Sequence, residues 1–107
     1  MDADAKGHQA DRYDLQDRYL EITRQRLPAA AREGNWAVRY DHCFMRIILD
    51  HLFEACWYEH LDRRLRAYKQ LNQQQLERAV AYGERMLAEG EPLVLEMNAR
   101  SLTWRNP

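Results

Sequence analysis

Residues 36–61 constrain the fold of this chain more than any other stretch. They read WAVRYDHCFMRIILDHLFEACWYEHL, in which apolar residues outnumber polar ones and neither glycine nor proline occurs. Nothing in this stretch must break a helix, because glycine and proline are the strongest helix breakers. The sequence therefore predicts that most of residues 36–61 form one long helix at the centre of the protein.

A polar stripe runs along this predicted helix. At 100° per residue, a wedge of roughly 120° holds six polar or reactive residues. They are Arg39, His42, Cys43, Arg46, Asp50 and Glu54. The remaining arc is mostly apolar and wide enough to need more than one neighbouring helix. The helix is capped by either Asn35 or Asp41, and Arg39 joins the stripe only in the first case.

The sequence also predicts helices on both sides of the central one. Asp11 or Asp14 caps a first helix that runs to about Leu27, and Pro28 forces a break or a restart. Gly34 and Asn35 then form a stop signal. A later helix begins at a capping box of Asn72 and Gln75, with one face made of Leu76, Val80, Gly83 and Leu87. Gly90 ends it, Pro92 starts the last helix, and the expected core positions there are Leu93, Met97 and Leu102.

Size and composition indicate one helical domain. The chain has 107 residues, 31% of them charged, with only four glycines and three prolines. A chain of this length can bury a core without disulfides or metals, and this composition is typical of helices. We predict an all-α fold, a compact bundle of about four helices over residues 11–107, preceded by a mobile tail over residues 1–10.

The charge balance and the N-terminal sequence bear on partners and location. The net charge is −1, which gives no global attraction to nucleic acid or to an anionic membrane. No apolar run reaches the ~18 residues of a membrane span, and the polar, acidic N-terminus is unlike a signal peptide. We therefore expect a cytoplasmic protein without membrane contact, in which Cys43 and Cys56 stay reduced.

Two segments carry a resemblance to a known family. One is a W-x-V-R-x-D-H-C-F-M-R-I-x-L-D core from Trp36 to Asp50, and the other is an N-x-x-S-L-x-W-R tail from Asn98 to Arg105. The chain resembles small bacterial proteins that are often labelled GCN5-related acetyltransferases. That label implies a mixed sheet and a glycine-rich turn for the pyrophosphate of coenzyme A, whereas the residues of this chain predict helices.

The stripe supports one site hypothesis. Arg39 and Arg46, at i−4 and i+3 from Cys43, are placed to lower the pKa of that thiol, and the two arginines are suited to an anionic group. An enzyme or anionic-ligand pocket would then use Arg39, His42, Cys43, Arg46 and Asp50. The alternative is a core thiol beside a structural ion pair of Arg46 with Asp50. Buried against Asn98 or Arg105, that pair would tie the C-terminal segment to the centre.

The sequence gives weaker support for a metal site and for a nucleic-acid site. Cys56 with His60, and His51 with Glu54, have helical spacing but no third ligand, so we expect no metal and no cofactor. A basic run forms an alternative nucleic-acid site that would contact phosphates. It consists of Arg63, Arg64, Arg66 and Lys69.

The leading functional prediction is a small interaction or regulatory module without catalytic activity. It would act through a protein partner or as a homodimer. Large rings favour interfaces, and this chain has more of them than a domain of its size easily buries. The predicted interface residues are Trp57, Tyr58, Tyr68 and Trp104.

Overall fold

All the regular structure in the computed structural model is helical. The model describes residues 2–106, and side chains from residue 12 to residue 106. Within residues 2–106 there is no strand, which confirms the all-α prediction and leaves no mixed sheet of the acetyltransferase type there. The elements are α1 (Asp2–Glu21), the π-helical turn η1 (Ile22–Arg26), α2 (Leu27–Gly34), α3 (Asp41–Phe53), the 3₁₀ turn η2 (Trp57–Glu59), α4 (Ala67–Gln70), α5 (Gln73–Glu89) and α6 (Glu91–Arg105).

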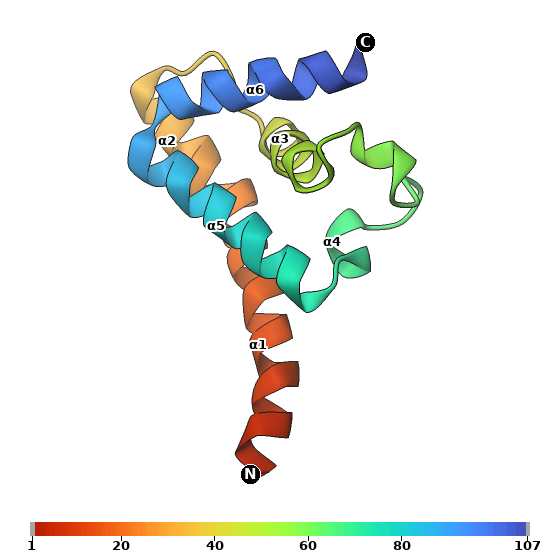
Figure 1. The fold of residues 1–107 in the computed structure, drawn as a ribbon. Helices are drawn as coiled ribbons and strands as arrows, with labels where there is room; N and C mark the ends of the chain where they lie inside the picture. Colours follow the sequence, from red (N-terminus) through yellow and green to blue (C-terminus); the bar gives the residue numbers. More distant parts are fainter. Residues whose placement is uncertain (1, 107) are drawn as a thin grey trace.

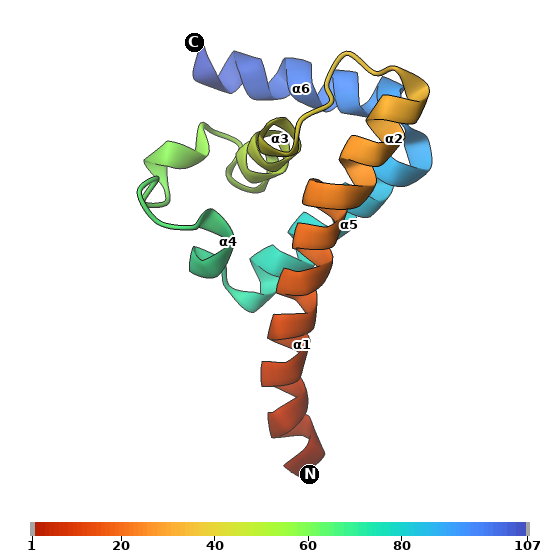
Figure 2. The same cartoon turned by 180° about the vertical axis from the view of Figure 1, so that it is seen from behind.

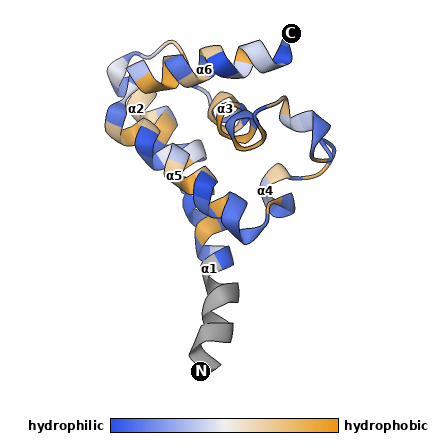
Figure 3. Ribbon diagram, in the orientation of Figure 1, coloured by the Kyte–Doolittle hydropathy of each residue, from blue (hydrophilic) through white to orange (hydrophobic). Residues whose placement is uncertain are grey.

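Helix α3 lies at the centre of the molecule. Both views of the ribbon place α6 across one side of α3 and α4 on the opposite side, while α5 runs beside α1, η1 and α2 (Figures 1 and 2). The apolar residues of α3 stand out in the hydropathy colouring, surrounded by mixed faces of the other helices (Figure 3). Phe44, Ile47 and Ile48 of α3 are fully buried. The prediction of a bundle around a central helix is therefore confirmed.

The central helix has 13 residues, Asp41–Phe53, and is much shorter than the predicted helix over most of residues 36–61. Of the two predicted starts, the structure has the later one, in which residues 36–40 precede the helix. It begins at Asp41, after an extended Tyr40, and Trp36 packs edge-on against Phe44 with ring centroids 6.4 Å apart. It ends where Glu54 takes a left-handed conformation, with φ at 50°. No glycine or proline causes these ends. Tertiary contacts of the flanking residues outweigh the helix propensity of the sequence.

The helical backbone continues from α1 through η1 into α2, across the position where Pro28 was predicted to force a break or a restart. The backbone is helical from Asp2, so the predicted start at Asp11 or Asp14 is wrong, and the mobility of residues 1–10 stays a prediction. The turn η1 precedes Pro28, and the N–H of Leu27 bonds to the carbonyl of Ile22. This wider turn lets the helix restart with Pro28 in its first turn, where no N–H is needed. Asn35 ends α2 in a left-handed conformation, as predicted.

The last two helices follow the sequence signals closely. The Asn72–Gln75 capping box is present in full, and Gly90 separates α5 from α6 at a φ of 78°. Gly83 is buried against η1, since a Cβ added there would lie 2.7 Å from Cγ2 of Ile22. The core prediction fails at Leu102, which is 44% exposed because α6 turns this residue away from α3.

Candidate functional site

A buried carboxylate joins three distant parts of the chain. Asp50 of α3 has no exposed surface. Its Oδ2 accepts hydrogen bonds from Arg105 Nε (2.7 Å) and Ser101 Oγ (2.6 Å), both on α6. Its Oδ1 accepts from Arg105 Nη2 (3.1 Å) and from the backbone N–H of Trp57 (3.0 Å). These bonds stabilise the charge of Asp50 inside the protein, and they raise the pKa of Arg105 further above its usual value.

Arg46 belongs to the same network but does not pair with Asp50. Its Nη1 donates to Ser101 Oγ at 2.7 Å, and its Nη2 donates to Asn98 Oδ1 at 2.6 Å. The predicted ion pair between Arg46 and Asp50 is therefore wrong, because Arg105 from α6 occupies the carboxylate instead. The predicted link between the centre and the C-terminal segment is present. Ser101 joins its two halves, because its Oγ accepts from Arg46 and donates to Asp50.

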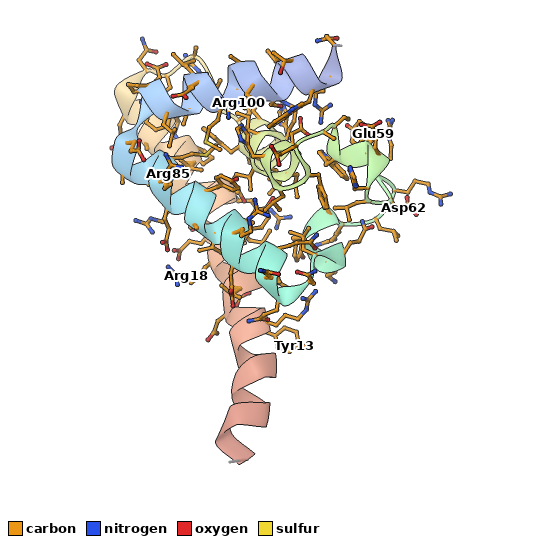
Figure 4. All side chains as sticks on the ribbon, viewed as in Figure 1. Tyr13, Arg18, Glu59, Asp62, Arg85 and Arg100 are labelled. Atoms are coloured by element: carbon orange, nitrogen blue, oxygen red, sulfur yellow. The ribbon has the colours of Figure 1, made fainter. Side chains whose placement is uncertain are left out.

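The bond from Trp57 to Asp50 also shapes the connector after α3. Glu54 reverses the chain, and the backbone of residue 57 returns to the carboxylate seven residues earlier. Further on, Asp62 and Gln70 close the connector through two bonds: Asp62 N–H donates to Gln70 Oε1 (2.9 Å), and Gln70 Nε2 donates to the Asp62 carbonyl (2.8 Å). Glu59 and Asp62 lie on the outer side of this connector (Figure 4).

A hollow of about 350 Å³ lies between α3, the connector and α4. Four aromatic side chains and three aliphatic ones form most of its wall. They are Tyr19, Trp57, Tyr58, Tyr68, Met45, Leu49 and Ala67. We call this hollow the ring pocket. Its size falls at the lower end of the range of about 300–1,000 Å³ typical of ligand sites.

The charged residues of the ring pocket are all bases. Arg24, His42, Arg46 and Arg66 complete the lining, and no acidic residue contributes to it. None of the ion pairs found among the side chains of residues 12–106 uses Arg24, Arg46 or Arg66. The pocket therefore combines an apolar wall with a positive field, which is the chemistry that binds an organic anion.

The structure separates the residues of the predicted polar stripe. Arg39 lies before α3 and donates to the Trp36 carbonyl (3.1 Å), so it does not join the stripe. His42 is exposed, stacked on Tyr40, and lines the ring pocket with Arg46. Cys43 is half-buried and does not line that pocket. Two of the five predicted site residues, His42 and Arg46, thus meet at the pocket, whereas Asp50 does not line it.

Three of the four predicted interface rings gather at the ring pocket. Trp57 and Tyr58 meet edge to face, with centroids 4.6 Å apart, and Tyr68 packs on Tyr19 at 6.4 Å. The fourth ring, Trp104, packs instead against the edge of His51 at 5.0 Å. These rings have neighbours within the chain, and only Tyr58 among them is largely exposed, at 42%.

The predicted basic patch does not form one continuous surface of free cations. Arg64 pairs with Asp62, and Arg63 lies over the ring of Tyr58, 4.4 Å from its centroid. Arg66 turns toward the ring pocket, next to the hydroxyl of Tyr68. Lys69 is exposed in α4. Of the four residues, Arg66 is the one placed at the candidate site.

His51 is the buried histidine of α3. Its Nε2 lies 3.0 Å from the Met97 carbonyl, between the rings of Tyr82 and Trp104. Burial lowers the pKa of His51 below its usual value, and the nearby Arg100 acts in the same direction, while the Met97 carbonyl, Asp50 and Glu54 oppose it. The folded protein therefore favours the neutral ring.

The lowered pKa of His51 predicts a loss of stability in mild acid. The unfolded chain takes up the proton near pH 6.5 while the folded chain resists it, so the His51 contribution is present above pH 6.5 and is lost as pH falls below it. The slope from this group is at most about 1.4 kcal/mol per pH unit. Urea unfolding of wild type and His51→Gln between pH 7.5 and 5 measures it, and parallel curves would contradict it.

Comparisons of this chain with known proteins found no match. No family model, no curated protein and no solved structure matches this chain. Among the described residues, no helix is both long and apolar enough to cross a membrane, and no group of three or more His, Cys, Asp or Glu side chains is placed to hold a metal ion.

Sequence reasoning missed several residues of the ring pocket. Tyr19 and Arg24 come from the first helix and η1, and Met45 and Leu49 were assigned only to the core. Helical periodicity predicts which face of a helix packs against its neighbours, but not where those neighbours leave a pocket open. A signal was present in Tyr19, a buried polar ring whose hydroxyl must face some polar space.

Proposed function

We propose that this chain is a small, non-catalytic binding domain for an organic anion with a flat apolar body. The observation that carries this proposal is the ring pocket, a hollow walled by aromatic side chains and lined by four basic residues without an acid. The predicted anionic-ligand pocket used five residues of the polar stripe, of which the ring pocket keeps His42 and Arg46. The proposal therefore places the anion site in the ring pocket instead of along the stripe. The two free thiols, Cys43 and Cys56, support a reducing, cytoplasmic location.

The walls of the pocket favour a flat ring as the body of the ligand. Trp57 and Tyr68 are held from within the protein, Trp57 by its backbone bond to Asp50 and Tyr68 by its contact with Tyr19. Rings that are fixed before binding lose little freedom when a ligand enters. Stacking or edge-to-face contact with them adds about 0.5–1.5 kcal/mol per ring pair beyond burial.

The basic residues supply the preference for an anion. Arg46 is fixed by Ser101 and Asn98, which orients a guanidinium that still has unused N–H groups. Arg24 and Arg66 contribute two exposed cations to the lining. We propose no bond-breaking step, since Cys43 does not line the pocket and His42 has no nucleophile beside it among the lining residues.

A matched pair of ligands tests this proposal. We expect naphthalene-2-carboxylate to bind at least about tenfold more tightly than the neutral naphthalene-2-carboxamide in isothermal titration calorimetry, because a charge-assisted bond is worth about 1.5–3 kcal/mol. Arg24→Gln/Arg66→Gln should remove most of that difference. Ala67→Trp, which fills the pocket, should abolish binding of both compounds.

The control for the filled pocket is Ala81→Trp, the same change at an exposed position on α5. It should bind like wild type. Near-ultraviolet circular dichroism confirms that each variant is folded. Equal binding of the acid and the amide, or binding that survives Ala67→Trp, would refute the proposal.

A second candidate function is the predicted protein-interaction module, acting with a partner or as a homodimer. The observation that favours it is a pair of exposed leucines on α6: Leu95 and Leu102, 43% and 44% exposed and seven residues apart on one face. Sedimentation equilibrium should then show an association that Leu95→Glu/Leu102→Glu disrupts. A monomer at every concentration would exclude the homodimer.

A further inference from the structure

A second hollow adjoins the ring pocket. It measures about 340 Å³ and lies between α2 and the segment that leads into α3. Its lining includes Arg32 and Arg39, with Tyr40 and Asp41 at one side. Arg24 lines both hollows, so they meet at a single side chain. A ligand that occupies one hollow is therefore within reach of the other.

The lining of the second hollow holds three arginines and one acid. Arg24, Arg32 and Arg39 take part in none of the ion pairs found among residues 12–106. In the same range, other arginines are paired: Arg18, Arg64, Arg85 and Arg105. The acid in the lining is Asp41, and its Oδ1 accepts the backbone N–H of His42 at 2.7 Å.

One of these arginines is anchored. Arg39 donates from Nε to the Trp36 carbonyl (3.1 Å) and from Nη2 to Asn35 Oδ1 (3.4 Å). Its guanidinium is held next to the hollow while Nη1 keeps its donors. Arg32 lies on α2 and lines the same hollow. Guanidinium groups are the side chains best matched to phosphate oxygens, because they bind in a bidentate fork.

We propose that the hollow of Arg24, Arg32 and Arg39 is a phosphate subsite, and that the ligand is an aromatic ring joined to a phosphate through a short spacer, as in a nucleoside monophosphate. The ring occupies the ring pocket, so this inference rests on the proposed function. Each hollow has room for one group of this size, which favours a single nucleotide over a strand.

Calorimetry with adenosine and adenosine 5′-monophosphate tests the subsite. We expect the monophosphate to bind at least about tenfold more tightly than the nucleoside. Arg32→Gln/Arg39→Gln should remove that gain and leave naphthalene-2-carboxylate binding unchanged, because neither residue lines the ring pocket. Arg26→Gln/Arg78→Gln removes the same charge from exposed positions outside both hollows and should behave like wild type.

The outcomes separate the two proposals. If naphthalene-2-carboxylate binds but the monophosphate and the nucleoside bind equally, or neither binds, the phosphate subsite is wrong and the ring pocket stands. If naphthalene-2-carboxylate does not bind at all, the proposed function fails. If a single-stranded tetranucleotide binds far more tightly than the monophosphate, with a steep salt dependence, the site holds a strand and the mononucleotide proposal is overturned.

Discussion

Asp50→Ala is expected to cost about 3–5 kcal/mol of unfolding free energy, the largest effect of any single substitution we consider. Breaking a buried ion pair by removing one partner typically has this cost, because the charge left behind, here the partly buried Arg105, loses its compensation. Asp50 has no exposed surface, and its loss leaves Arg105, Ser101 and the Trp57 N–H without their acceptor. Urea unfolding followed by circular dichroism at 222 nm measures the effect.

The matched control is Asp17→Ala, which removes an exposed carboxylate from α1 and should change stability by no more than about 0.5 kcal/mol. A double-mutant cycle of Asp50→Ala with Ser101→Ala should give a coupling of about 0.5–3 kcal/mol. A loss below about 1 kcal/mol for Asp50→Ala would mean that this carboxylate is not essential to the connection between α3 and α6.

The second large effect is expected for Gly83→Val, at about 3 kcal/mol of destabilisation. Even a Cβ at this position would lie 2.7 Å from Ile22 Cγ2, and Ile22 is itself only 2% exposed. Overpacking a filled core costs about 1–3 kcal/mol and occasionally more. Helix propensity acts in the opposite direction, because valine is a slightly better helix former than glycine, but the difference is only a few tenths of a kcal/mol. Thermal and urea unfolding both report the change.

A compensating variant tests the cause. Ile22→Ala removes the clashing methyl group, so Gly83→Val/Ile22→Ala should be more stable than the sum of the two single changes predicts. Ala81→Val places a valine at an exposed site on the same helix, away from Ile22, and should cost less than about 1 kcal/mol. Additive costs at positions 22 and 83 would show that the two residues are not in contact.

The sequence predicted best where the signals are local. The capping box of Asn72 and Gln75, the left-handed stop at Asn35 and the small residue at Gly83 depend on neighbours within a few positions or on one facing helix. It left the start of α3 open between two alternatives and failed at its C-terminal end, because the chain reversal at Glu54 depends on a bond between Asp50 and residue 57. No local pattern marks that bond.

In the candidate site, too, local patterns were predictable and contacts between distant residues were not. Helical spacing placed Arg46 and Asp50 on one side of the predicted central helix, and burial against Asn98 or Arg105 was one alternative for that pair. Spacing could not show that Arg105, 55 residues away, would displace Arg46 from the carboxylate. The ring pocket combines side chains from four separate segments, and its existence depends on their packing, which periodicity does not encode.

The Asp50 network also fixes the order in which parts of the fold can form during synthesis. Asp50 leaves the ribosome before its partners Ser101 and Arg105, which follow 51 and 55 residues later. At synthesis rates of about 5–20 residues per second, this gap lasts several seconds. During that interval α3 carries a charge that has nothing to pair with, so burying it is unfavourable. The nascent chain therefore completes its centre only when α6 arrives.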